Sequence, residues 1–147
     1  MMEKSINILE LRTLTEPLGL DVQALMGELE PGLVVSAEWL GKVVEAPGTH
    51  FFAAVDDDDR VVGCATLCVF DTPTGRKANV EDVVVNSACR GQHIGKKLME
   101  HIIDFARREL GSVDLHLTSR PHRVAANNLY RSLGFQQRET NVYKLVI

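Results

Sequence analysis

Apolar and polar positions along the chain follow the helical repeat in some stretches and alternate in others. The longest helical pattern covers residues 94–110, where two adjacent apolar rows leave the charged side chains on the opposite face. A helix of this kind packs one broad face on a sheet. Shorter helical patterns occupy residues 22–29, 36–43 and 123–133. In the second of these, Ser36 is expected to cap a helix whose apolar face holds Trp39, Leu40 and Val43.

Strands are predicted where β-branched and aromatic residues gather. Residues 51–55 and 61–70 flank the acidic stretch Asp56–Arg60, which predicts a hairpin whose tip is a solvated turn. A loop containing Pro73 and Gly75 is expected over residues 71–77. The remaining strands are expected at residues 6–11, 78–85, 113–118 and, as one strand or a pair, 135–147. This order of strands and helices predicts an α/β domain with a mixed sheet.

Size and composition fit one soluble globular domain over residues 1–147. No apolar run reaches the ~20 residues that a membrane-spanning helix needs. The amino-terminal residues lack the apolar core of a signal peptide, so a cytoplasmic location without membrane attachment is expected. The formal net charge of -4 disfavours a general nucleic-acid binder, which normally carries a basic patch.

The three cysteines predict neither a disulfide framework nor a metal site. They form no Cys-x-x-Cys pair. Cys64 and Cys68 fall on one expected strand, which separates their Cα atoms by ~13 Å, too far for a bridge. Buried, unreactive thiols are the simpler interpretation.

A glycine-containing turn joins the expected strand ending at Val85 to the long helix. The first amides of a helix have no intrahelical partner, and the helix dipole is positive there, so such a turn favours an anion. Gly91 and Gly95 permit close backbone approach, and Arg90 with Lys96–Lys97 adds positive charge. A diphosphate fits these features. The Walker and Rossmann glycine patterns are both absent from this turn.

The turn resembles the pyrophosphate-binding motif of the GCN5-related (GNAT) acetyltransferases, Arg/Gln-x-x-Gly-x-Gly/Ala. Arg90-Gly91-Gln92-His93-Ile94-Gly95 matches it except at His93, where the family usually has glycine. A helical φ at His93 would be harmless, whereas a positive φ would strain the turn.

A second stretch, residues 123–135, resembles the later helix of the same family, Ala-x-x-Leu-Tyr followed by Gly-Phe. Many members carry asparagine three residues before that alanine, where this chain has Arg123. Asn127 is then the candidate to supply the amide. Asn127 and Tyr130 share a helix face at spacing three.

The resemblance implies a single GNAT-like domain, with a mixed, mostly antiparallel central sheet flanked by helices and with splayed central strands. It implies an acyl-CoA-dependent N-acyltransferase that moves acetyl from acetyl-CoA to a primary amine by direct attack in a ternary complex, without a metal. The implied acetyl-CoA-binding residues are Val83, Val84, Val85, Arg90, Gly91, Gln92, His93, Ile94, Gly95, Lys96, Asn127 and Tyr130.

Two residues are candidates for catalysis, Tyr130 and Glu81. Tyr130 matches the family's usual proton donor to the departing thiolate, and a packed aromatic is its structural alternative. Glu81 is the candidate base because a carboxylate in a Val-rich strand is costly unless used or paired. Alternation places Glu81 with Val83 and Val85, and Asp82 on the other face, unless a bulge exchanges the faces. A salt bridge at Glu81, a water chain, Asp82 and His116 remain alternatives.

The amine acceptor is left open by the sequence. The Glu81-Asp82 pair before the valine run resembles the corresponding strand of glucosamine-6-phosphate N-acetyltransferases, and polyamines, antibiotics, amino acids and protein amines are further options. A non-catalytic acyl-CoA-binding module is the alternative to an enzyme. A homodimer stays open.

Overall fold

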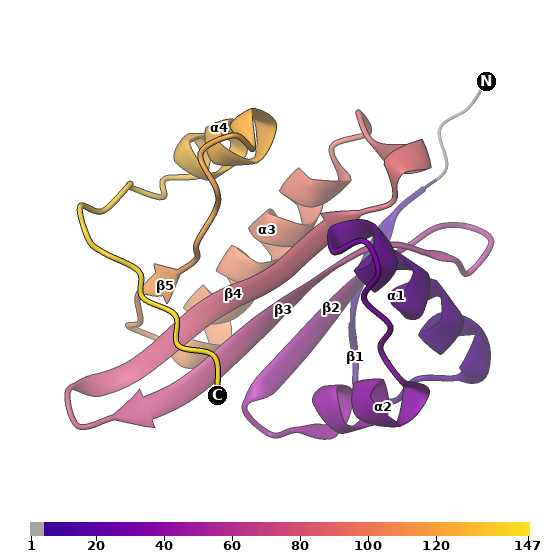
Figure 1. Ribbon diagram of the computed structural model, residues 1–147, viewed down its shortest axis with the longest axis horizontal. Helices are drawn as coiled ribbons and strands as arrows, with labels where there is room; N and C mark the ends of the chain where they lie inside the picture. Colours follow the sequence, from indigo (N-terminus) through magenta and orange to yellow (C-terminus); the bar gives the residue numbers. More distant parts are fainter. Residues whose placement is uncertain (1–4) are drawn as a thin grey trace. The chain divides into compact units, whose positions relative to one another are not determined.

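The computed structural model describes residues 5–147 and forms two compact units, one ending at Leu117 and the other spanning Thr118–Ile147. The first unit is built on a sheet with the strand order β1-β2-β3-β4-β5 (Figure 1). Its strands are β1 Asn7–Leu11, β2 Thr49–Val55, β3 Val61–Thr72, β4 Gly75–Val85 and β5 Leu115–His116. Its helices are α1 Glu16–Leu29, α2 Ala37–Glu45, the 3-10 turn η1 Ser87–Cys89, α3 Ile94–Phe105 and the π-helical turn η2 Ala106–Leu110.

The sheet is mixed and mostly antiparallel, as predicted. Strands β1 to β4 pair antiparallel with their neighbours. Strand β5 pairs parallel to β4, and only at Ala78–Leu115 and Asn79–His116. The ladder between these strands therefore stops early, as expected for splayed strands, and the edge of β4 from Val80 to Val85 has no strand beside it among residues 5–147.

Helices cover both faces of this sheet. On one face α1 and α2 bury Val22, Leu25 and Leu40 in a core that also holds Cys64 of β3 and Val84 of β4. Helix α3 packs on the other face, where β3 places a glycine under it. A Cβ added at Gly63 would lie 3.2 Å from Ile94 Cγ2, so this glycine allows the close approach of α3.

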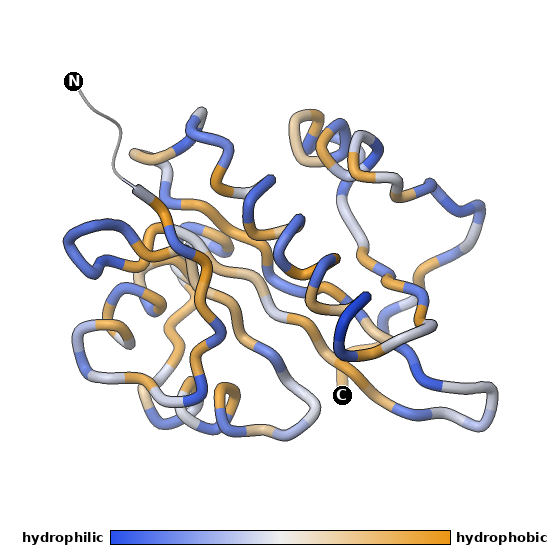
Figure 2. The backbone as a smooth tube through the Cα atoms, turned by 180° about the vertical axis from the view of Figure 1, so that it is seen from behind, coloured by the Kyte–Doolittle hydropathy of each residue, from blue (hydrophilic) through white to orange (hydrophobic). Residues whose placement is uncertain are grey.

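Asp56, the first residue of the acidic hairpin tip between β2 and β3, stabilises this tip. The Asp56 carboxylate accepts hydrogen bonds from the backbone N–H groups of Asp58 and Arg60 at 2.9 and 3.0 Å. The Arg60 guanidinium contacts Asp21 of α1 at 2.8 Å, and this hydrogen bond lowers the pKa of Asp21. Figure 2 shows the tip as a hydrophilic turn, which confirms the predicted hairpin.

Several predicted elements are shorter or differently placed. Helix α2 is capped by Ser36, whose Oγ accepts from Trp39 N–H at 3.0 Å, but the buried stripe is Leu40 and Val44, while Trp39 lies 59% exposed. Of the residues expected on the apolar face, Leu40 is buried, and its buried partner is Val44 at spacing i+4. The expected loop over 71–77 is mostly paired strand, with the turn at Pro73–Thr74.

Two predicted strands are corrected. The strand expected over 113–118 contains only Leu115 and His116, because β4 offers a partner at two positions. The strand or strand pair expected over 135–147 does not form. Val142, Tyr143 and Leu145 are apolar or aromatic yet exposed, since no neighbouring strand among the residues described supplies a ladder.

The second unit contains one helix, α4 Val124–Ser132, as predicted. Gly134 ends it with φ 99°, a conformation that favours glycine. Phe135 N–H donates to Tyr130 O at 3.0 Å, and the two rings meet edge-on with centroids 6.0 Å apart. Within residues 5–147 no helix combines the length and the apolar character needed to cross a bilayer.

Candidate active site

Strand β4 contains a β-bulge at the position of the acidic pair. Thr66 pairs with Glu81 and Cys64 pairs with Val84, so Asp82 and Val83 together oppose one residue of β3. Asp82 adopts φ 52°, the left-handed conformation in which aspartate is tolerated better than most residues. The extra residue lies in the strand predicted to carry the chemistry.

The bulge exchanges the faces of the strand. Glu81 shares its face with Val84, not with Val83 and Val85 as simple alternation predicted. Val84 belongs to the core under α1 and α2, so Glu81 lies on that side of the sheet. Its carboxylate has no hydrogen-bond or ion-pair partner among residues 5–147, which leaves the salt-bridge alternative without support. Partial burial, and next the charge of Asp82, raise its pKa.

The chain leaves β4 through a short capped turn. Asn86 N–H donates to Val62 O at 2.8 Å, and the Asn86 side chain accepts from Ala88 N–H at 2.9 Å, which caps η1. The Glu28 carboxylate of α1 accepts from Ser87 Oγ and N–H at 2.7 and 3.2 Å. Sequence reasoning missed both anchors, although an asparagine immediately before a short helical turn is a recognisable capping signal.

The glycine-containing turn then presents the start of α3. Gly91 has φ 86° and His93 has φ 59°, and the first intrahelical hydrogen bond runs from Lys97 N–H to His93 O at 3.0 Å. The amides of Ile94, Gly95 and Lys96 therefore have no acceptor within the helix. Three donors at the positive end of a helix dipole form a site suited to a diphosphate.

Positive charge surrounds these amides. Arg90 and Lys97 are exposed, and Lys96 makes only a loose contact of 3.9 Å with Glu100. Gln92 lies half-buried in the turn between them. The positive φ of His93 is the strained outcome of the two that the sequence allowed, since only glycine adopts it without cost.

The open edge of β4 continues directly into this turn. Val83, Val84 and Val85 lie on the stretch of β4 that β5 does not pair, immediately before Asn86. An extended ligand with amide groups would find unpaired backbone there and free helix-start amides a few residues later. His116 of β5 lies opposite Asn79, at the point where the pairing stops.

Tyr130 and Asn127 belong to the second unit. Tyr130 is buried, and this burial raises the pKa of its phenol, partly offset by the charge of Arg123. The Asn127 side-chain amide donates to the carbonyl oxygens of Arg120 and Arg123, both at 2.9 Å. These bonds brace the start of α4 and leave the Asn127 side-chain oxygen free of them, so its predicted contact with acetyl-CoA stays a prediction.

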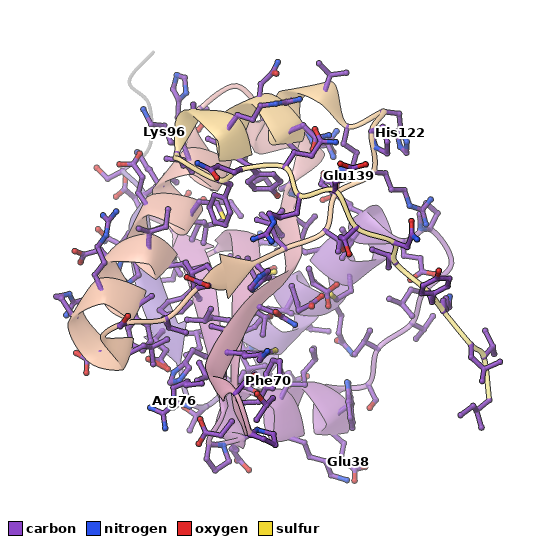
Figure 3. The ribbon with its side chains drawn as sticks, turned by 90° about the vertical axis from the view of Figure 1, so that its left-hand side faces the viewer. Glu38, Phe70, Arg76, Lys96, His122 and Glu139 are labelled. Carbon is purple, nitrogen blue, oxygen red and sulfur yellow. The ribbon has the colours of Figure 1, made fainter. Side chains whose placement is uncertain are left out.

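A separate open pocket of about 320 Å³ lies at the other end of the sheet. It is lined by residues that include His50, Phe70, Asp71 and Arg76. Figure 3 labels Phe70 and Arg76 at one end of the first unit and Lys96 at the opposite end. The pocket is therefore not part of the turn before α3. Among residues 5–147 no group of three or more His, Cys, Asp or Glu side chains is arranged to hold a metal ion.

Known proteins resemble the chain over most of its length. The sequence profile described as "Acetyltransferase (GNAT) family" matches residues 16–135. N-acetyltransferase 8B of Rattus norvegicus is 33% identical over 91 residues, which are 61% of this chain and 40% of that protein. The chain thus spans about two fifths of that relative.

In two further matches the alignment covers a larger share of the known protein. The N-alpha-acetyltransferase RimI of Mycobacterium tuberculosis (strain ATCC 25618 / H37Rv) is 31% identical over 115 residues, covering 75% of this chain and 70% of that protein. The structure of AAC(6')-Iy in complex with the bisubstrate analog CoA-S-monomethyl-acetylneamine has a TM-score of 0.77 at 15% identity, covering 97% of this chain and 99% of that one.

Replacing His93 tests the strained turn. His93→Gly should raise the free energy of unfolding by up to about 1 kcal/mol, because glycine adopts a positive φ without steric cost. His93→Val should lower it by about 1–2 kcal/mol, because a β-branched residue is disfavoured there. Urea unfolding of the three proteins measures both changes. Equal stability of the two variants would contradict the left-handed conformation.

Proposed function

Because the chain belongs to the acetyltransferase (GNAT) family, we propose that it transfers acetyl from acetyl-CoA to a primary amine, with both substrates bound together. Acetyl transfer from acetyl-CoA is the chemistry of the family. The observation that carries the proposal for this chain is the unpaired edge of β4 leading into the free amides of Ile94 to Lys96. The cytoplasmic location remains an expectation, and a homodimer stays open.

The cosubstrate is proposed to bind along this edge and turn. Its diphosphate accepts hydrogen bonds from the amides at the start of α3, with Arg90, Gln92 and Lys96 beside it. Its pantetheine arm pairs with the backbone of Val83 to Val85. Gly91 and Gly95 leave room for the ligand because they carry no side chain. The residues present fit the group, since donors, positive charge and open backbone follow one another along the chain.

The transfer makes three chemical demands on the protein. The amine must lose a proton before or during attack on the thioester carbonyl, the oxyanion must be stabilised, and the departing thiolate must gain a proton. We assign the second task to a backbone amide of the open stretch of β4. AAC(6')-Iy in complex with a CoA-linked bisubstrate analog supports direct transfer, because one molecule there joins the cosubstrate to an acceptor.

Glu81 is proposed as the base. Its raised pKa and its lack of a protein partner suit a carboxylate that takes a proton from an ammonium substrate, directly or through water. His116 and Asp82 lie close to it along the strands and are the candidates to replace it. Tyr130 is proposed to protonate the thiolate. Burial raises the pKa of its phenol and so keeps the donor protonated at neutral pH.

Release of free CoA thiol tests the activity and the role of Tyr130 together. The wild-type protein should release thiol from acetyl-CoA when amines are supplied, whereas a non-catalytic binding module would not. Tyr130→Phe should lower kcat at least ~10-fold and leave CoA affinity within about twofold, because the ring still packs against Phe135. Wild-type turnover by the variant would reduce Tyr130 to a structural residue.

The pH dependence of the same reaction tests Glu81. A protonated Glu81 cannot accept a proton, so the rate should fall as the pH drops through its raised pKa, at a higher pH than for an ordinary glutamate. Glu81→Gln should lower kcat/KM by a factor of roughly 10²–10⁴ and abolish this fall of the rate at low pH, the acidic limb of the pH–rate profile. Asp82→Asn is the control, expected to shift the limb slightly without abolishing it. An unaltered limb in Glu81→Gln would assign the proton to another group.

A further inference from the structure

Polar side chains line up across three strands on the face of the sheet that carries Glu81. Cys68 of β3, Asn79 of β4 and His116 of β5 are direct neighbours in register. Thr66 of β3 and Glu81 form the next pair along the same strands. Residues two apart on a strand, and residues directly opposite, point to the same face, so the five side chains form one surface, named here the polar floor.

The polar floor is accessible and unsatisfied. Glu81 and His116 are exposed and the other three are half-buried, although Val84 and Cys64, next in line on this face, belong to the core. None of the five side chains has a hydrogen-bond or ion-pair partner among the residues described. Burial, and next the charges of Glu81 and Asp82, raise the pKa of the Cys68 thiol.

We propose that the polar floor binds the acceptor, and that the acceptor is a cationic amine bearing hydroxyl groups next to its nitrogen, in the manner of an amino sugar. This inference rests on the proposed function. The ammonium group lies toward Glu81, and its hydroxyls exchange hydrogen bonds with Thr66, Asn79 and His116.

Size and chemistry support this class over an apolar amine. The row of Cys68, Asn79 and His116 lies ~7 Å along the strands from the pair Thr66 and Glu81, and neighbouring strands are ~4.8 Å apart. The polar floor is therefore about as large as one sugar ring with its substituents. An apolar amine would cover Asn79 and Thr66 without replacing their hydrogen bonds to water, which is unfavourable. A hydroxyl-bearing amine satisfies them.

Turnover of two probe amines tests the inference. D-glucosamine should have a kcat/KM at least tenfold above that of benzylamine. Thr66→Val and Asn79→Ala should each lower the value for glucosamine at least fivefold, whereas any benzylamine turnover should not fall and should rise, because the uncompensated polar group is gone. Thr74→Val, in the exposed hairpin turn, is the matched control and should change neither. Equal losses for both amines, or a preference for benzylamine, would overturn the inference.

Alkylation of Cys68 tests binding without catalysis. In a Cys89→Ser background only Cys68 should react with iodoacetamide, because Cys64 is fully buried and burial raises its pKa to about 12. Increasing D-glucosamine should slow this alkylation at least threefold, whereas benzylamine should not. Absence of protection would overturn the polar floor even in an enzyme that acetylates other amines. Protection without thiol release would keep the floor and contradict the acetyltransferase proposal.

Discussion

The extra residue in β4 at Asp82 determines what the rest of the site can do. Before the bulge, Glu81 faces α1 and α2 together with Thr66, and after it Val84 takes that side in the core. Without the bulge, a strict period of two would put Glu81 on the face of Val83 and Val85. Because Asp82 adopts a left-handed conformation, β4 places the Glu81 carboxylate and, three residues later, the buried Val84 on the same face of the sheet.

Strand β4 also has an unpaired edge, and it leads into the turn before α3. Because β5 stops pairing at Asn79, the following backbone of β4 is open, and it points at the turn that begins α3. Asn86 and Glu28 fix that turn from both sides. The positive φ at Gly91 and His93 then turns the chain so that the amides of α3 remain without acceptors. Open backbone, donors and positive charge thus follow from local conformations of consecutive residues.

Much of this arrangement could be predicted from residues close in sequence. The hairpin, the caps and the turn before α3 carry local signals, as Ser36, Gly91 and the pair of motifs show. The position of the bulge and the length of β5 could not, because both depend on pairing between distant strands. Residues 135–147 show the same limit, since Val142, Tyr143 and Val146 are residue types typical of strands but no partner strand pairs with this segment among the residues described. The polar floor could not be predicted either, because Cys68, Asn79 and His116 become neighbours only through the register of β3, β4 and β5.

Calorimetric titration of acetyl-CoA into the wild-type protein and Gly95→Leu tests most directly whether the start of α3 holds the diphosphate. Leucine keeps the helix but places a side chain where the ligand would approach the amides. The affinity should fall at least tenfold, a loss of ~1.4 kcal/mol. Gly41→Leu, in α2 where an added Cβ meets nothing within 4 Å, is the matched control and should bind as the wild type does. Unchanged affinity in Gly95→Leu would contradict the assignment of this turn as the acetyl-CoA site.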